Sequence, residues 1–180
     1  MAQFGYLVNP LECVACKACE IACKARNGLE SPGPRLRIAQ SVESGTFPDT
    51  KLVNQSFGCM HCENPACVEA CPVGAITKRE EDGVVVADRS KCIGCQACHS
   101  ACPWGVPQYR DEDGTMIKCD GCLDRRMMGL QPACAQTCFY EGLYAGTLEE
   151  LYDKAAELGL EVEPLSGETG PSVLVAKIDS

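Results

Sequence analysis

The residues with the clearest chemistry in this sequence are its cysteines, which number 16 in a chain of 180 residues. They fall into four groups of four, and none is left over. The groups are Cys13, Cys16, Cys19 and Cys23; Cys59, Cys62, Cys67 and Cys71; Cys92, Cys95, Cys98 and Cys102; and Cys119, Cys122, Cys134 and Cys138. Thiolates bind zinc and iron–sulfur clusters, so this composition predicts a fold held together largely by metal centres.

The spacing within the groups favours [4Fe–4S] clusters. The first and third groups follow the pattern C-x2-C-x2-C-x3-C, and Pro103 after the third group completes the run typical of bacterial ferredoxins. The second group widens its middle gap but keeps Pro72 after its last cysteine, and the fourth carries an insert over 123–133. Small residues in the gaps, such as Ala15 and Gly94, allow backbone N–H groups to approach a cluster.

Two other uses of cysteine fit the sequence less well. A disulfide framework suits a small secreted protein, but it does not explain four repeats of C-x2-C. Structural zinc commonly uses two well-separated C-x2-C pairs for each ion, whereas here three cysteines fall within seven residues and a fourth follows. The agreement of four independent runs therefore favours iron–sulfur clusters.

The ligands of each cluster can be predicted by comparison with two-cluster ferredoxins. In those proteins the fourth cysteine of each run binds the cluster that the other run holds. The second and third groups both end in Cys-Pro and lie close together, so we expect them to exchange their fourth cysteines. By elimination, the first and fourth groups exchange theirs. The predicted ligand sets are Cys13, Cys16, Cys19 and Cys138 for cluster 1; Cys119, Cys122, Cys134 and Cys23 for cluster 2; Cys59, Cys62, Cys67 and Cys102 for cluster 3; and Cys92, Cys95, Cys98 and Cys71 for cluster 4.

Short strands and helices must position these groups. Alternating polar and apolar residues predict a hairpin over 35–42 with 51–57, and the turn at 81–83 predicts a second hairpin over 75–78 with 83–87. A short N-terminal strand is expected over 4–8. Near the C-terminus, Thr147 and Glu150 form a capping-box pattern, and the helix that follows ends near Gly159. A last strand is expected within 172–178.

The predicted fold class is α+β, with two ferredoxin-like two-cluster modules related by a pseudo-twofold axis. We expect the outer module to comprise residues 1–56 and 103–146, and the inner module residues 57–102. We expect residues 147–180 to form a helix-plus-strand extension that packs as a lid over the outer module, with docking of a partner as the alternative role.

Charge and composition exclude several functions. The formal net charge of −9 argues against nucleic-acid binding, which requires a basic surface. No run of 18 apolar residues is present, and the N-terminus has no signal-peptide pattern of its own. No nucleophile–base constellation or phosphate-binding glycine loop is recognisable, so we expect no catalytic residues.

Some residues near the cysteines have two interpretations. The insert over 123–133 contains two arginines and two methionines, which suit either a redox-partner surface or compensation of cluster charge. Lys91 and Lys118 directly precede a cysteine and either raise a cluster potential or are solvated. His61 and His99 are expected to form hydrogen bonds or lie at the surface, because every group already has four cysteines.

These motifs make the sequence resemble the four-cluster iron–sulfur subunits of the dimethyl sulfoxide reductase superfamily, which includes polysulfide reductases and formate dehydrogenases. The resemblance covers nearly the whole sequence, including 13–27, 59–67, 71–77, 91–95, 102–109 and 118–122. Arg125, Gly129 and the run from Pro132 to Cys134 match the family's fourth motif. One departure is Phe139, which follows Cys138 where relatives often have proline.

The resemblance implies the nested ligand exchange and a non-catalytic electron-transfer subunit with four [4Fe–4S] clusters. Nitrate-reductase-like members replace a third-group cysteine with tryptophan, but here all four cysteines are present. The implied partners are a molybdenum or tungsten bis-pterin catalytic subunit and a quinone-interacting membrane anchor subunit. The implied location is peripheral, in a membrane-associated complex that is either co-exported with a signal-bearing partner or cytoplasmic. The alternatives are a free polyferredoxin that shuttles electrons and a zinc-binding interaction module.

Overall fold

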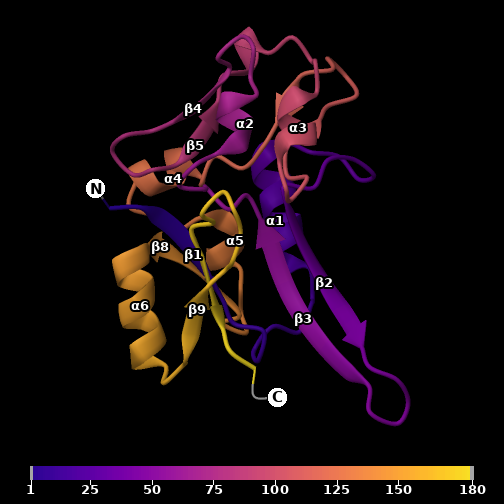
Figure 1. Cartoon of the computed structure of the whole chain (residues 1–180), viewed down its shortest axis with the longest axis vertical. Helices are drawn as coiled ribbons and strands as arrows, with labels where there is room; N and C mark the ends of the chain where they lie inside the picture. Colours follow the sequence, from indigo (N-terminus) through magenta and orange to yellow (C-terminus); the bar gives the residue numbers. More distant parts are fainter. Residues whose placement is uncertain (1, 179–180) are drawn as a thin grey trace.

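The computed structural model describes residues 2–178, and Figure 1 shows three regions. A small sheet with one helix lies beside a region of short helices and hairpins that carries the cysteines. A long hairpin projects from one side. The mixed α and β composition confirms the coarse fold prediction.

The main sheet has four strands in the order β8-β1-β10-β9. Their bounds are Phe4–Val8 for β1, Leu143–Thr147 for β8, Val162–Pro164 for β9 and Val173–Ala176 for β10. Strand β1 is buried along its whole length, since it pairs antiparallel with β8 and parallel with β10. Gly5 is required in β1 because a Cβ atom there would overlap the carbonyl oxygen of Ser172. The predicted N-terminal and C-terminal strands are confirmed.

Helix α6 (Leu148–Glu157) covers one face of this sheet and begins with the predicted capping box. The Thr147 hydroxyl accepts a hydrogen bond from the Glu150 backbone N–H at 3.2 Å, and the Glu150 carboxylate accepts one from the Thr147 N–H at 2.7 Å. Leu151 and Ala155 pack against Leu7 and Leu174 of the sheet. Gly159, at φ +66°, lies just beyond the helix end, as the sequence predicts.

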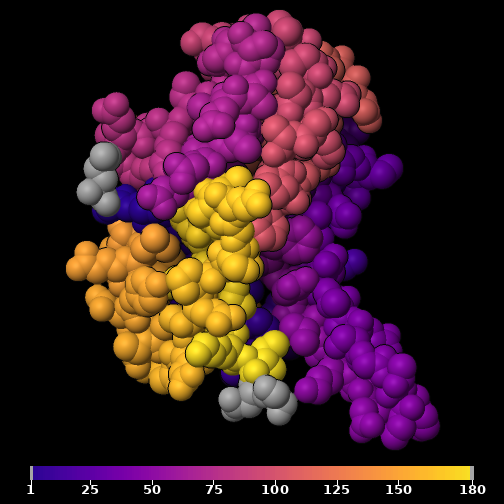
Figure 2. All heavy atoms as spheres, in the orientation of Figure 1, coloured from indigo at the N-terminus to yellow at the C-terminus, as the bar shows by residue number. Residues whose placement is uncertain are grey.

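Three hairpins complete the strands. They pair β2 (Arg37–Ser44) with β3 (Lys51–Gly58), β4 (Ile76–Lys78) with β5 (Val85–Ala87), and β6 (Gln108–Tyr109) with β7 (Met116–Ile117). The first two are the predicted hairpins. The outer half of β2–β3 projects from the body, and Phe47 at its tip is 93% exposed (Figures 1 and 2).

The cysteine groups lie on short helices and the loops before them. These helices are α1 (Ala18–Asn27), α2 (Ala66–Glu69), the 3-10 helix η1 (Arg89–Lys91), α3 (Ala97–Ala101), α4 (Leu123–Met127) and α5 (Ala133–Gln136). Helices α1 and α5 pack together, as do α2 and α3. The first pair brings the first and fourth cysteine groups side by side, and the second pair does the same for the second and third groups.

The C-terminal extension contacts more of the protein than a lid over the predicted outer module would. Its helix lies on the sheet, but the loop between β9 and β10 reaches the segment that follows Cys62, and in Figure 2 the yellow C-terminal segment lies against the magenta part of the chain. The backbone N–H of Glu63 donates to Gly170 at 2.7 Å, and that of Asn64 donates to Thr169 at 3.0 Å. The extension reaches beyond the predicted lid because the backbone N–H groups that follow Cys62 need hydrogen-bond acceptors. No local secondary structure supplies those acceptors, and the loop does.

Candidate metal centres

All four cysteine groups begin with the same backbone turn. The residue before the second cysteine has a positive φ in each group: +50° at Ala15, +43° at His61, +70° at Gly94 and +65° at Gly121. This left-handed conformation curls the backbone so that the first two cysteines of a group point to a common side. The structural repeat therefore extends to the second and fourth groups, whose cysteine spacing differs.

The first cavity brings together the predicted ligands of cluster 1. Its lining includes Cys13, Cys16, Cys19 and Cys138, although Cys138 lies more than a hundred residues beyond the others. Burial raises the pKa of the Cys13 thiol, and the nearby Cys19, Cys138 and Cys16 raise it further. Four sulfurs that disfavour one another's ionisation form a site suited to a cationic centre.

A second cavity brings together the predicted ligands of cluster 4. Its lining includes Cys71, Cys92, Cys95 and Cys98. The Cys71 sulfur accepts a hydrogen bond from the Ala75 N–H at 3.2 Å, and the Cys92 sulfur accepts one from the Met116 N–H at 3.3 Å. Backbone N–H groups that point to thiolate sulfurs are the usual surroundings of an iron–sulfur cluster.

The predicted ligands of cluster 2 also lie close together. Burial raises the pKa of the Cys23 thiol strongly, and Cys119, Cys134 and Cys122 contribute to the increase. Burial likewise raises the pKa of Cys122 to about 11, with contributions from Cys119 and Cys134. All four thiols are buried, so this set is the most shielded from solvent.

The predicted ligands of cluster 3 lie close together as well. Burial raises the pKa of Cys67 to about 12, and Cys59, Cys102 and Cys62 add to the effect. Burial also raises the pKa of Cys62, again with contributions from Cys59 and Cys102. The structure thus brings each predicted set of four cysteines into mutual proximity.

The cysteine sets predicted for clusters 1 and 4 surround spaces rather than single points. A tetrahedral zinc–thiolate site would bring its sulfurs to within about 3.8 Å of one another. Within residues 2–178, no three His, Cys, Asp or Glu side chains converge in the way that ligands of a single ion do. The two cavities described above instead have their cysteines spread around the wall, which is the arrangement that a multinuclear cluster requires.

Side chains from segments without cysteines also reach the sulfur atoms. The Tyr6 hydroxyl lies 3.6 Å from the Cys119 sulfur, and the Ser56 hydroxyl lies 3.3 Å from the Cys19 sulfur. No sequence pattern predicts these contacts, since Tyr6 and Ser56 lie on strands distant from the cysteines they approach. Hydroxyl groups near the sulfurs supply further donors to a bound cluster.

Arg37 is a buried cation that sequence reasoning missed. It is 3% exposed, its guanidinium lies 4.4 Å from the centre of the Tyr6 ring, and it donates to the Ser56 hydroxyl at 3.2 Å. Burial acts to lower the pKa of Arg37, but the nearby cysteine thiolates, chiefly Cys134, outweigh burial and raise it. A buried charge needs compensation, and the cysteine sulfurs together with the Tyr6 hydroxyl supply it here.

Buried donors without partners also lie around the cysteines. In the described part of the protein, four buried side-chain polar atoms lack a hydrogen-bond partner of standard geometry: His61 Nε2, Trp104 Nε1, Arg110 Nε and Thr169 Oγ1. Three of the four residues lie against cysteines. Trp104 packs with Cys59 and Cys119, Thr169 lies against Cys62, and His61 lies against Cys119. The sulfur atoms of iron–sulfur clusters would satisfy such donors, so the residues present fit these groups.

The remaining residues named from the sequence have defined positions. Lys118 is buried and donates to the carbonyl oxygens of Val85 and Cys119, whereas Lys91 is exposed and lies 3.5 Å from Asp88. His99 is exposed and its Nδ1 lies 2.7 Å from the Pro107 oxygen.

The arginines of the insert make contacts within the protein. Arg126 forms an ion pair with Asp82 at 2.6 Å and lies over the Phe4 ring at 4.1 Å, and Arg125 donates to the Gln131 oxygen at 2.9 Å. The methionines are free of such contacts, since Met127 is 81% exposed and Met128 is 67% exposed. The exposed part of the insert therefore includes a run of apolar side chains, Met127, Met128 and Leu130, beside the polar Asp124 and Gln131.

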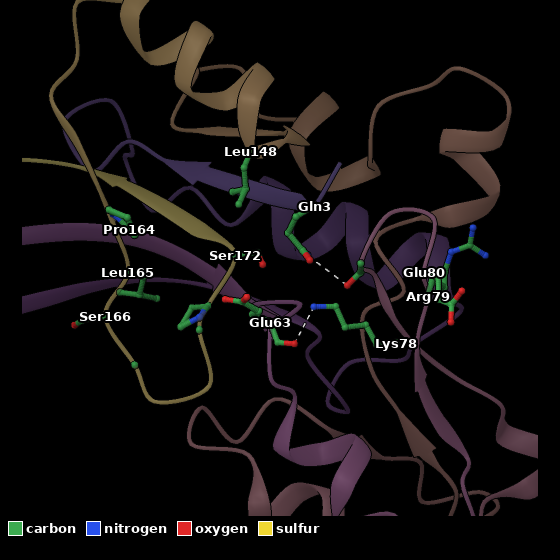
Figure 3. A pocket seen from close by; sticks show the side chains of 14 residues that line it. Gln3, Glu63, Lys78, Arg79, Glu80, Leu148, Pro164, Leu165, Ser166 and Ser172 are labelled. Carbon is green, nitrogen blue, oxygen red and sulfur yellow. Dashed lines mark hydrogen bonds between the residues drawn. The ribbon is translucent and has the colours of Figure 1, made fainter. Parts of the chain in front are cut away.

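A further groove lies away from the cysteine cavities. It has a volume of about 770 Å³ and runs between the loop of the second hairpin and the loop between β9 and β10 (Figure 3). Leu148 and Leu165 line one part of it, while Lys78 lines another and donates to the Glu63 carbonyl oxygen at 2.9 Å. No cysteine is among the residues that line this groove.

Among the helices formed by residues 2–178, none is both long enough and apolar enough to cross a bilayer.

Comparisons with known proteins agree with the cysteine chemistry. The family model described as a 4Fe-4S dicluster domain matches residues 51–148, and a 4Fe-4S binding domain matches residues 10–26. A component of the anaerobic dimethyl sulfoxide reductase of Escherichia coli (strain K12) is 39% identical over 181 residues, which cover 96% of this chain and 88% of that protein. A sulfite dehydrogenase subunit of Allochromatium vinosum is 32% identical, with 93% of this chain and 77% of that protein covered. The thiosulfate reductase electron transfer subunit PhsB of Salmonella typhi is 37% identical, with 82% and 78% covered.

Proposed function

The protein belongs to the iron–sulfur subunits of the molybdopterin oxidoreductases, and we propose that it relays electrons between a bis-pterin catalytic subunit and a quinone-linked membrane subunit or soluble carrier. It is a non-catalytic electron-transfer subunit of an oxidoreductase complex and binds iron–sulfur clusters. The proposed pterin cofactor of the catalytic partner contains molybdenum or tungsten.

We further propose four [4Fe–4S] clusters, each bound by one of the four cysteine sets. The support is the proximity of the cysteines within each set, including the approach of Cys138 to Cys13 and of Cys23 to Cys119. When bound, such clusters accept and release one electron at a time at potentials that their surroundings determine. The protein supplies the thiolates, the N–H donors and the shielding from water.

The cysteine sets form a continuous line through the protein. Helix α1 carries Cys19 of the first set and Cys23 of the second. Cys119 of the second set packs with Cys59 of the third, in one buried cluster of side chains. The third and fourth sets are joined by α3, where Cys98 of one set is followed by Cys102 of the other. This connectivity supports the order 1–2–3–4 for an electron relay.

The two ends of this line reach the surface. Of the 16 cysteines, all of which lie in the described part of the protein, Cys16 and Cys95 are exposed, and they belong to the first and fourth sets. Exposed apolar residues adjoin cysteines of both end sets in the sequence. Val14 and Phe139 are 48% and 89% exposed beside the first set, and Ile93 is 64% exposed beside the fourth. Exposed apolar surface marks interaction sites, which supports fixed redox partners at both ends.

The remaining parts of the proposal concern organisation and location. We propose that the cysteine region comprises two ferredoxin-like two-cluster modules, supported by the pairing of α1 with α5 and of α2 with α3. We also propose that the subunit is peripheral in a membrane-associated complex, on either face of the membrane. The support for a complex is that its relatives are themselves components of multisubunit reductases and dehydrogenases, one of them an electron transfer subunit by name.

The observation that carries the proposal is the proximity of cysteines from distant segments in four sets, two of which line a cavity. The test is native purification of the protein from its source or with its co-expressed neighbours, followed by iron analysis and electron paramagnetic resonance (EPR). We expect co-purification with a pterin-containing subunit, about 16 iron atoms per chain and broad absorbance near about 400 nm. A stable monomer with the same iron content would instead support a diffusing polyferredoxin. A colourless zinc protein would contradict the proposal altogether.

A further inference from the structure

His61 is an exception among the four equivalent turns. The matching positions in the other groups are Ala15, Gly94 and Gly121, which are the residue types that tolerate a positive φ at small cost or leave space for a cluster. His61 has the same positive φ but carries a large polar ring that is completely buried. Histidine is more frequent than most residues in this conformation, yet it is strained relative to glycine. A function for the ring would explain why it occupies this position.

The orientation of the ring is fixed by its neighbours. The Val85 backbone N–H donates to His61 Nδ1 at 3.1 Å. The ring of Phe4 packs edge-on against it, with 5.8 Å between the ring centres. Two side chains also bind the His61 carbonyl oxygen, because the Ser172 hydroxyl donates to it at 2.9 Å and Gln3 donates at 3.1 Å. The ring therefore has little freedom to turn away from its present position.

The acceptor role of Nδ1 determines where the ring proton lies. A ring nitrogen that accepts a hydrogen bond carries no proton, so the His61 imidazole is neutral and has a single proton. Because Nδ1 accepts from Val85, that proton is on Nε2. Nε2 is buried and lacks a partner of standard geometry. An N–H group left in this state costs free energy unless an acceptor is present in the complete protein.

The sulfur against which the His61 ring lies, that of Cys119, belongs to a different cysteine set from the one that surrounds His61 in sequence. His61 lies between Cys59 and Cys62, but Val85 connects it to the fourth group, since the Val85 carbonyl oxygen accepts a hydrogen bond from Lys118. The Tyr6 ring, centred 6.3 Å from the imidazole, places its hydroxyl 3.6 Å from the Cys119 sulfur. Cys119 is thus the sulfur-bearing residue that these contacts place beside the His61 ring.

We propose that His61 donates a hydrogen bond from Nε2 to the Cys119 sulfur and thereby raises the reduction potential of the cluster bound by Cys119, Cys122, Cys134 and Cys23. The inference rests on the proposed function, since it requires that cluster. Reduction adds a negative charge that spreads onto the ligand sulfurs, so a donor to a sulfur stabilises the reduced state more than the oxidised state. His61 is thus a positioning residue that links the loop of one cluster to a ligand of the next.

Two substitutions at His61 separate the hydrogen bond from the volume of the ring. In His61→Asn, the side-chain oxygen can still accept from Val85, and asparagine tolerates the positive φ, but the shorter side chain does not reach the position of Nε2. In His61→Gln, an amide N–H does reach that position. His99→Asn is the matched control, because His99 adjoins a cysteine in the third group but binds the Pro107 oxygen rather than a sulfur.

The experiment is a potentiometric titration of the purified complex, in which EPR follows each cluster. We expect His61→Asn to lower one midpoint potential, so that the ratio of reduced to oxidised cluster at the original midpoint falls about fivefold, or about 40 mV for a one-electron couple. The signal that shifts should be the one altered by Cys119→Ser. His61→Gln should retain most of the potential, and His99→Asn should leave all midpoints unchanged.

Unchanged midpoints in His61→Asn at full iron content would overturn the inference, as would equal shifts in the asparagine and glutamine variants. If His61→Asn loses iron, His61→Gly repeats the test with the residue that the third and fourth groups already have at this position, and its midpoint decides by the same criterion. Absence of EPR signals from the unsubstituted complex would instead overturn the proposed function.

Discussion

Cys19 and Cys23 lie one turn apart on helix α1 and contact different cysteine sets. Cys19 lines the cavity that also contains Cys13 and Cys138, whereas Cys23 lies beside Cys119 and Cys134. Four residues of an α-helix span about 6 Å, so one short helix holds the ligands of two centres at a fixed separation. The rigidity of this helix, more than the loops, sets the distance between the first two members of the proposed relay.

The exchanged cysteines provide the most direct test of the ligand sets. We expect Cys138→Ser to remove or convert the cluster bound by Cys13, Cys16 and Cys19, because Cys138 completes that set from a distant segment. Iron content should fall from about 16 to about 12–15 atoms per chain, depending on whether the cluster is lost or becomes a three-iron form. Iron analysis with EPR measures this change, and Thr137→Ala is the control.

Cys23 is close in sequence to Cys19 but is predicted to bind a different cluster. Cys23→Ser should therefore alter a different EPR signal from the one that Cys138→Ser alters. If both substitutions affected the same signal, the exchange would be wrong.

Arg37 should raise the potentials of the first two clusters through its buried charge. Arg37→Met removes a cation close to Cys134, Cys119 and Cys19. For charges roughly 7–10 Å apart at an effective dielectric constant of about 20, the loss corresponds to a decrease of roughly 70–100 mV. Potentiometric titration measures the shift. Arg37→Lys keeps the charge and should retain most of the potential, and a shift equal to that of the methionine variant would exclude an electrostatic role.

The apolar surface beside the first cysteine set should contribute to partner binding. Phe139 is 89% exposed and directly follows Cys138. Burial of a phenylalanine side chain contributes about 1.5–3 kcal/mol, so Phe139→Ser should weaken the complex about tenfold or more. The dissociation constant is measured with the purified catalytic subunit.

Tyr152→Ser, which replaces a 46% exposed aromatic residue on α6, is the control. Equal affinities for the Phe139→Ser variant and the unsubstituted protein would show that this end of the molecule does not contact the catalytic subunit.

The capping box of α6 should affect stability without affecting the clusters. Thr147→Ala removes the side-chain acceptor for the Glu150 N–H, which costs about 1 kcal/mol and lowers the thermal midpoint by about 2–4 °C. Circular dichroism measures the midpoint, and visible absorbance reports the clusters. Glu149→Gln, in the same helical turn, should have a smaller effect. Simultaneous loss of iron in Thr147→Ala would show that α6 supports the cysteine region more directly than its contacts with the sheet suggest.

Several local elements could be predicted from the sequence. The hairpins β2–β3 and β4–β5 follow from alternating polarity and turn residues, and the start of α6 follows from the pairing of Thr147 with Glu150. These features depend on contacts between residues close in sequence. The prediction of a lid was incomplete because the carbonyl oxygens of Gly170 and Thr169 accept hydrogen bonds from the backbone after Cys62. Sequence patterns do not encode this contact.

By itself, the sequence determined the chemistry of the sites, since the cysteine spacing specifies thiolate ligation and the family membership follows from the same motifs. Only the tertiary structure revealed the surroundings of the sulfurs. Arg37, Tyr6 and His61 reach Cys119 or its neighbours through the packing of strands and loops that are far apart in the sequence. Ligation requires only the right residues at short spacing, whereas burial of charges and donors depends on how every distant segment packs together.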